Sequence, residues 1–187
     1  VDLWVKFEND PMTGNTNELF WTSDSPTGNA DVRFDFGYVG DGSALGAASL
    51  TDGWFLLIDA PASTKFLSMS DTVTSDTWYH IAITRDSSNK LRFFRNGTSL
   101  TIDDQTGGGS TTYSDGYTFT TAINPYDQST GNGYGYLIGS TFSYGQFEGM
   151  IDEIRILKGS AVWTSSFTAP TAPYSSCSSG TTPTEAH

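Results

Sequence analysis

Apolar and polar residues alternate along much of the chain, and turn-forming residues separate the alternating runs. A period of two is typical of strands that bury one face. The runs that show it lie at residues 1–7, 32–36, 78–85 and 90–95. Two further runs, 54–58 and 151–157, are apolar enough for strands buried on both faces. No window carries apolar residues at helical spacing, so the sequence predicts an all-β sandwich or barrel with minimal helix.

The inward positions of these strands predict the core. They are Leu3, Val5, Phe34, Phe36, Trp78, Ile81, Ile83, Leu91, Phe93, Ile154 and Ile156. A register error of one residue would exchange the two faces of a strand. If Trp78 and Ile154 are buried, replacing either by Ala should cost about 2 to 5 kcal/mol.

Two segments depart from the alternating pattern. Residues 105–133 are rich in Gly, Ser, Thr and Tyr, which predicts a long surface excursion with one short strand at 117–123. Residues 170–187 contain much Ser, Thr, Pro and Gly. We therefore expect a domain over 1–169 and a C-terminal arm or linker over 170–187 that packs poorly on its own domain.

The net charge and the lengths of the apolar runs exclude two classes of partner. The 187 residues include 9 Lys+Arg and 21 Asp+Glu, a formal net charge of −12. Binding to nucleic-acid phosphates needs a basic footprint, so no nucleic-acid partner is expected. No stretch approaches the ~20 apolar residues of a membrane span, which predicts no membrane insertion. The single cysteine, Cys177, cannot close an internal disulfide.

Three stretches together carry a family resemblance. They are residues 77–98, which end in an Asn96-Gly97 hairpin turn, residues 147–156, and residues 1–7. This pattern resembles the laminin G-like domains of the concanavalin A-like lectin/glucanase superfamily. The resemblance implies a two-sheet antiparallel jelly-roll sandwich whose preceding edge strand lies upstream of residue 1.

The continuation at residues 158–170 is similar to modules of bacterial surface proteins and phage structural proteins. This similarity implies an extracellular, cell-surface or virion location.

The carboxylates do not form the pattern of a glycosidase. Hydrolases of the superfamily place Glu-x-Asp-x-Glu on one strand, where alternate residues share a face. Here Glu148 and Asp152 flank Met150, which stands where the orienting Asp would be. We expect Glu153 and Arg155 to pair along one face. The sequence therefore predicts no hydrolase.

Other catalytic arrangements are equally unsupported. A lyase on this fold would need a Tyr or His base with further His, Gln or Arg groups. The chain has only His80, expected to pack within a strand, and the terminal His187. We therefore expect that the protein is not an enzyme.

A cluster of tyrosines and polar residues predicts the binding site. Aromatic rings suit the apolar faces of sugar rings, and Asn and Asp suit their hydroxyls. The predicted carbohydrate- or partner-binding residues are Tyr113, Tyr117, Asn124, Tyr126, Asp127, Asn132 and Tyr134. Replacing Tyr117 or Tyr126 by Ala should then weaken binding and leave stability nearly intact. Contact with a protein, or tyrosines half-buried on a sheet without a ligand, are the alternatives.

These observations favour a non-catalytic recognition or adhesion module that binds a glycan or another surface protein. The alternative is a structural subunit or decoration protein of a phage capsid, tail or filament, in contact with neighbouring subunits. A glycan-active enzyme ranks third. No cofactor is required, although the resemblance allows calcium held by Asp side chains; Asp41, Asp52 and Asp127 are the candidates.

Overall fold

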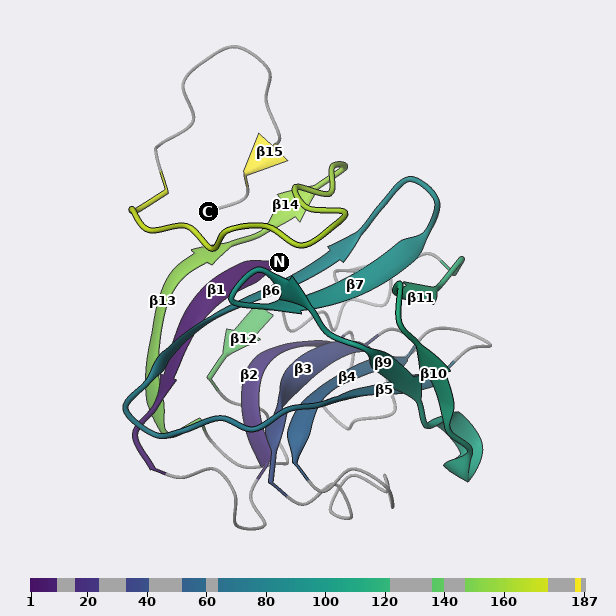
Figure 1. The fold of residues 1–187 in the computed structure, drawn as a ribbon, viewed down its shortest axis with the longest axis horizontal. Coiled ribbons are helices and arrows are strands. Elements are labelled where there is room, and N and C mark those ends of the chain that lie inside the picture. Colours follow the sequence, from purple (N-terminus) through teal and green to yellow (C-terminus); the bar gives the residue numbers. More distant parts are fainter. Residues whose placement is uncertain are drawn as a thin grey trace.

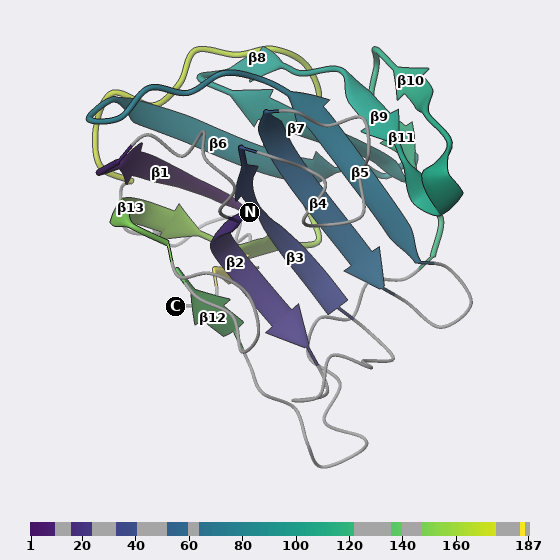
Figure 2. The same cartoon turned by 90° about the horizontal axis from the view of Figure 1, so that it is seen from below.

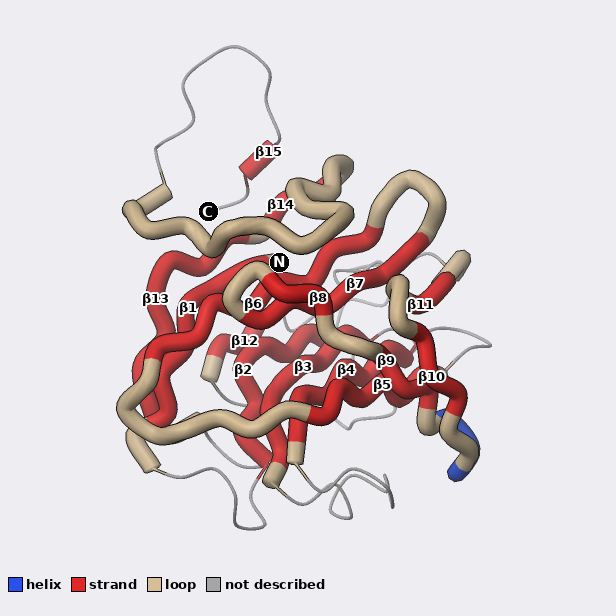
Figure 3. The backbone as a smooth tube through the Cα atoms, in the orientation of Figure 1, coloured by secondary structure: helices blue, strands red, loops and turns tan. Residues whose placement is uncertain are grey.

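The chain folds into two antiparallel sheets that lie face to face (Figure 1). The structure is a computed structural model that describes residues 1–9, 16–23, 33–40, 52–59, 64–121, 136–139, 147–174 and 184–185. Within these ranges the only helix is a short 3₁₀ turn, η2 (Thr106–Gly108), and strands dominate the backbone (Figure 3). The predicted all-β sandwich of two antiparallel sheets is confirmed.

The first sheet has six described strands. Their order is β11-β7-β6-β1-β13, and β8 pairs with β7. The strands are β1 (Asp2–Phe7), β6 (Trp78–Arg85), β7 (Lys90–Arg95), β8 (Thr98–Ser99), β11 (Tyr117–Thr118) and β13 (Gly149–Arg155). β6 and β7 coincide with the predicted runs at 78–85 and 90–95. The turn after β7 has positive φ at both Asn96 (51°) and Gly97 (79°), as a type I′ hairpin requires.

The second sheet has seven described strands in the order β10-β9-β5-β4-β3-β2-β12. Figure 2 shows it lying over the first sheet. The strands are β2 (Thr16–Ser23), β3 (Arg33–Val39), β4 (Gly53–Asp59), β5 (Lys65–Ser70), β9 (Ile102–Asp104), β10 (Thr111–Tyr113) and β12 (Tyr136–Ile138). A separate pair joins β14 (Leu157–Lys158) to β15 (Thr184–Glu185).

The core lies between the two sheets, as the alternation predicts. Most of the predicted positions are buried there: Leu3, Val5, Phe34, Phe36, Ile81, Ile83, Leu91 and Phe93. Ile156 is partly buried against this cluster. Among the side chains that the structure describes, Trp54 is the largest fully buried one, and it contacts Phe7, Tyr38 and Phe93.

Two predicted core positions are wrong. Trp78 is 39% exposed and Ile154 is 36% exposed. Trp78 pairs with Lys6, which lies between the buried Val5 and Phe7 and so points to the opposite face of the sheet. Ile154 follows a register shift in the outermost described strand of its sheet, β13, where Glu153 has a φ of 51°. We therefore no longer expect the large stability cost of a buried side chain at either site.

Residues 159–174, which we call the C-terminal strap, cover part of the outer face of the first sheet (Figure 1). The backbone N–H of Phe167 donates to the carbonyl of Gly97 at 2.8 Å, and the Thr84 hydroxyl donates to the carbonyl of Trp163 at 2.8 Å. A Cβ at position 97 would lie 1.9 Å from the Phe167 carbonyl oxygen. Gly97 therefore permits both the hairpin turn and the close approach of the strap.

Candidate functional site

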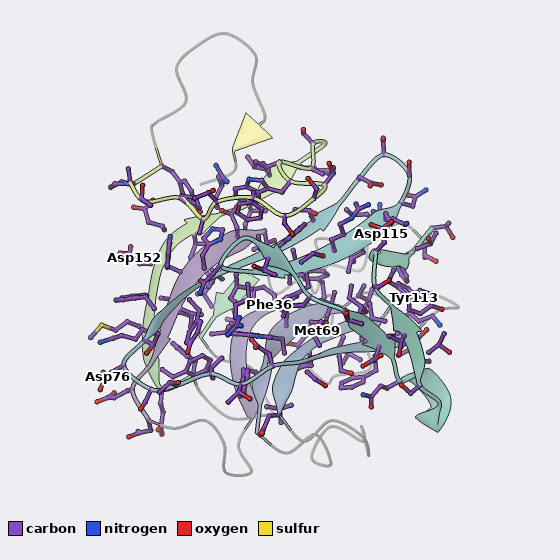
Figure 4. The ribbon with its side chains drawn as sticks, viewed as in Figure 1. Phe36, Met69, Asp76, Tyr113, Asp115 and Asp152 are labelled. Atoms are coloured by element: carbon purple, nitrogen blue, oxygen red, sulfur yellow. The ribbon has the colours of Figure 1, made fainter. Side chains whose placement is uncertain are left out.

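The predicted tyrosine site begins at one edge of the sandwich, where β10 and β11 bring Tyr113 and Tyr117 together. Figure 4 labels Tyr113 at this edge. The two rings meet edge to face with their centroids 5.1 Å apart. Tyr117 is only 7% exposed and belongs to the core, whereas Tyr113 is half-buried against it. The ring of Tyr117 therefore supports Tyr113 from within.

This burial corrects one expectation about Tyr117. The Tyr117 ring has no exposed face on which a sugar could stack. Its replacement by Ala would leave a cavity in the core and lower stability instead of leaving it intact. The other predicted binding residues lie outside the described residues: Asn124, Tyr126, Asp127, Asn132 and Tyr134.

The predicted excursion over 105–133 contains more regular structure than expected. Its first part, up to residue 121, forms η2, β10 and β11. Of the expected strand at 117–123, the part described up to residue 121 forms a strand at Tyr117–Thr118. Short strands at this edge hold the tyrosines in place because β10 pairs with β9 and β11 pairs with β7.

Charged groups surround the tyrosine edge. Lys65 Nζ lies 3.0 Å from Asp104 Oδ2 and 5.8 Å from the centroid of the Tyr117 ring. Hydrogen bonding to Asp104 raises the pKa of Lys65, and burial raises the pKa of Tyr117. Burial alone would raise the pKa of Asp104, but hydrogen bonds from Thr106 and Lys65 lower it overall. This edge is therefore charged and hydrogen-bonded at neutral pH.

A second group of charges lies beside β11 and β7. Lys90 Nζ contacts Asp115 Oδ2 at 2.6 Å, and Arg92 lies 2.7 Å from Asp86 and 3.6 Å from Asp115. The hydrogen bond from Arg92, and those from the backbone at Lys90 and Ser88, lower the pKa of Asp86. These ionised groups and the half-buried ring of Tyr113 can donate and accept hydrogen bonds at the surface of the domain.

The carboxylates of the closing strand are separated along one face. Met150 pairs with Lys6 and Asp152 pairs with Trp4. The side chains of Glu148, Met150 and Asp152 therefore share the outer face of the first sheet. Met150 occupies the middle position, where hydrolases of the superfamily carry the orienting Asp of Glu-x-Asp-x-Glu. Glu148 and Asp152 therefore lack the third carboxylate of that set.

The expected pair between Glu153 and Arg155 is wrong. Arg155 instead donates from Nε and Nη2 to the two oxygens of Asp2, at 3.0 and 3.1 Å. Glu153 accepts the backbone N–H of Tyr174 at 2.8 Å. The register shift at Glu153 separates the two side chains, and each finds a partner distant in sequence.

A polar cluster forms where the C-terminal strap covers the first sheet. Asp2 and His80 are buried in it, and Arg155 and Tyr174 are half-buried. The Tyr174 hydroxyl donates to Asp2, and His80 Nε2 lies 3.1 Å from the Tyr174 oxygen and 3.4 Å from Asp2 Oδ2. Burial alone would raise the pKa of Asp2, but hydrogen bonds from His80, Arg155 and Tyr174 lower it. Burial and the bond to Asp2 raise the pKa of Tyr174, which therefore remains a donor.

Aromatic rings surround this polar cluster. Trp163 and Phe167 stack with centroids 4.0 Å apart, and each meets His80 edge-on, at 5.6 and 5.8 Å. The guanidinium of Arg155 lies 4.1 Å from the ring centroid of Tyr174. His80 is completely buried, which confirms its predicted packing within a strand.

The expectation of a poorly packed arm after residue 169 is wrong at Tyr174, because Tyr174 holds this cluster. Sequence reasoning missed Asp2, Arg155 and Tyr174 as partners. The one local signal was a set of aromatic residues spaced through the polar segment 159–174.

Among the described residues, no group of three or more His, Cys, Asp or Glu side chains is placed to hold a metal ion. Asp52 is described just before β4, and the calcium candidates Asp41 and Asp127 lie outside the described residues. Within the same part of the chain, no helix has the length and apolar character needed to cross a membrane.

Comparison with known proteins adds the family. A laminin G family model, described as the concanavalin A-like lectin/glucanases superfamily, matches residues 1–101 of the 187. This range contains β1 to β7 and the hairpin that ends in β8. Neither a search of curated proteins nor a search of solved structures gave a match. The matched half of the chain and the two-sheet fold agree, and the chain belongs to the laminin G-like domains of the concanavalin A-like lectin/glucanase superfamily.

Proposed function

We propose that this domain is a non-catalytic recognition module that binds carbohydrate on an extracellular or virion surface, through the edge at Tyr113. The observation that carries the proposal is the half-buried ring of Tyr113, held edge-on by Tyr117, whose own ring lies 5.8 Å from the Nζ of Lys65 in the Lys65–Asp104 ion pair. An aromatic ring fixed among hydrogen-bonding groups suits both the apolar face and the hydroxyls of a sugar. Membership of a superfamily that includes lectins supports this ligand class.

Recognition without catalysis agrees with the carboxylates at the start of β13. Met150 stands between Glu148 and Asp152, so this strand lacks the Glu-x-Asp-x-Glu set that hydrolases of the superfamily place on one face. His80 is completely buried beneath the strap, so it cannot reach a substrate as a base. We propose that binding needs no cofactor. Comparison of binding in calcium and in EDTA tests whether calcium contributes to it.

Glycan-array screening of the folded domain, with calcium and then with EDTA, tests the proposal. On the glycan that binds best, Tyr113→Ala should weaken binding about fivefold or more, because a fixed aromatic contact contributes about 1 kcal/mol. Tyr113→Phe retains the ring and should retain most of the affinity. Val162→Ala is the control, because Val162 is exposed on the strap.

Two results would contradict the proposal. One is the absence of binding across diverse polysaccharides in both calcium and EDTA. The other is equal affinity of the wild type and Tyr113→Ala for the bound glycan. Either result would favour the structural-subunit hypothesis, in which this edge contacts a protein neighbour.

A further inference from the structure

The outer face of the first sheet has one end that the strap leaves uncovered, which we call the Trp78 face. It consists of Trp78, Lys6 and Met150 on three neighbouring strands, with Asp76, Glu148 and Asp152 around them. Trp78 is 39% exposed and Met150 is 58% exposed. Lys6 lies between the indole and the thioether, and exposed Trp and Met side chains are enriched at contact surfaces.

Sheet register places these side chains on one surface. Lys6 pairs with Trp78 on β6 and with Met150 on β13, so the three lie side by side across the sheet. Their neighbours in sequence, Val5 and Tyr79, point into the core. The rings and chains of this row therefore project away from the sandwich.

The charge on this face is mainly negative. Lys6 Nζ is held by Asp76 Oδ1 at 3.4 Å, so its single positive charge is already matched. The exposed Glu148 and Asp152 stand on either side of Met150, and in neither case is a salt-bridge partner present among the described residues. Figure 4 shows Asp76 and Asp152 at the same side of the domain, opposite Tyr113.

We propose that the Trp78 face docks a basic, partly apolar peptide segment of a partner protein. A guanidinium or ammonium group stacks on the indole of Trp78, where the nearby carboxylates strengthen the cation–π attraction. Glu148 and Asp152 pair with further basic side chains, and Met150 contacts an apolar one. The alternation of acid, Met and acid from Glu148, just before β13, to Asp152 matches an extended peptide with basic, apolar and basic residues at alternate positions.

Charge complementarity decides between this occupant and others. A second copy of the same face would bring carboxylates against carboxylates, and the whole chain carries a formal charge of −12. An anionic membrane surface is disfavoured for the same reason. The face lies on a different part of the domain from Tyr113, so the docking proposal stands independently of glycan binding.

Fluorescence anisotropy with a short labelled peptide of alternating Arg and Leu tests the docking proposal on the full chain. Trp78→Ala should weaken binding about tenfold, and Trp78→Phe less, because Phe keeps an aromatic face. The double variant Glu148→Gln with Asp152→Asn should weaken binding about fivefold and reduce its dependence on salt. Asp59→Asn, on β4 of the other sheet, removes one charge and should leave binding unchanged.

Several results would overturn the docking proposal. They are failure of the Arg/Leu peptide to bind, equal binding of a matched Glu/Leu peptide, and equal loss of affinity in Asp59→Asn and the double variant. A neutral oligosaccharide that displaces the peptide would assign the face to sugar instead. Self-association that Trp78→Ala abolishes in sedimentation would assign it to a second copy.

Discussion

The two ends of the outer face of the first sheet are built on the same three strands, β6, β1 and β13, yet they differ in what covers them. At one end, the strap encloses Asp2, His80 and Arg155, and its last residue, Tyr174, contacts them. At the other end, Trp78 and Met150 face solvent. Strand pairing is regular at the uncovered end, whereas the register shift of β13 lies at the covered end.

Burial, and not the number of charged contacts, sets how much each of these ion pairs contributes to the free energy of unfolding. Among the described residues, each end has one pair between a Lys or Arg and an Asp: Arg155 with Asp2, and Lys6 with Asp76. The first is enclosed and bidentate, while the second joins a single Nζ to a carboxylate that is 80% exposed. Exposed pairs contribute little, but breaking a buried pair leaves an uncompensated charge.

The largest expected effect comes from breaking the enclosed pair. Arg155→Met should lower the free energy of unfolding by about 3 to 5 kcal/mol, because Asp2 would stay buried without its bidentate partner. Lys6→Met is the matched control and should change stability by less than about 1 kcal/mol. Urea denaturation of both variants measures the difference, and similar losses in the two would contradict the comparison.

Removal of a single hydroxyl should have a smaller effect. Tyr174→Phe takes away the donor to Asp2 and the partner of His80 Nε2, at an expected cost of about 1 to 3 kcal/mol. Limited proteolysis should then cut the strap more rapidly than in the wild type. Tyr113→Phe, at the half-buried edge, is the control. Equal stability of Tyr174→Phe and the wild type would show that the strap does not depend on this contact.

Acid should lower the stability that Asp2 contributes at the covered end. The pKa of Asp2 is lower in the folded chain than its ordinary value, so the folded state favours the ionised carboxylate. The stabilisation is present above the unfolded pKa, about 3.9, and is lost as the pH falls through the lower folded value. Urea denaturation as a function of pH should show this loss in the wild type. Asp2→Asn should be less stable at neutral pH and should lose less below about pH 4; an equal loss in both would contradict the assignment.

The smallest expected effect is at the uncovered end. Trp78→Ala should lower stability by less than about 1 kcal/mol, because the ring already faces solvent. Trp54→Ala, which removes a fully buried indole, should cost about 3 to 5 kcal/mol. Thermal or urea unfolding measures both. A loss at Trp78 as large as that at Trp54 would mean that the sheet face is covered.

Local patterns predicted much of the fold but little of the candidate site. Alternation placed β6 and β7 to the residue, and Asn96-Gly97 identified a turn that local φ preferences alone favour. At the tyrosine edge, the sequence singled out Tyr113 and Tyr117 without distinguishing the half-buried ring from the core one. That difference depends on β10 and β11 lying at facing edges of two sheets.

The sequence by itself determined the all-β class and the approximate positions of β1, β3, β4, β6, β7 and β13, because side-chain period and turn chemistry act over a few residues. It did not identify β2 and β5, which lie inside the second sheet. Tertiary structure alone decided which face of β6 is outside, and hence that Trp78 is exposed. It also decided the partner of Asp2, because Tyr174 is 172 residues away in sequence and meets it only when the strap closes over the sheet. Contacts between such distant residues follow from strand register and chain path, which no local pattern specifies.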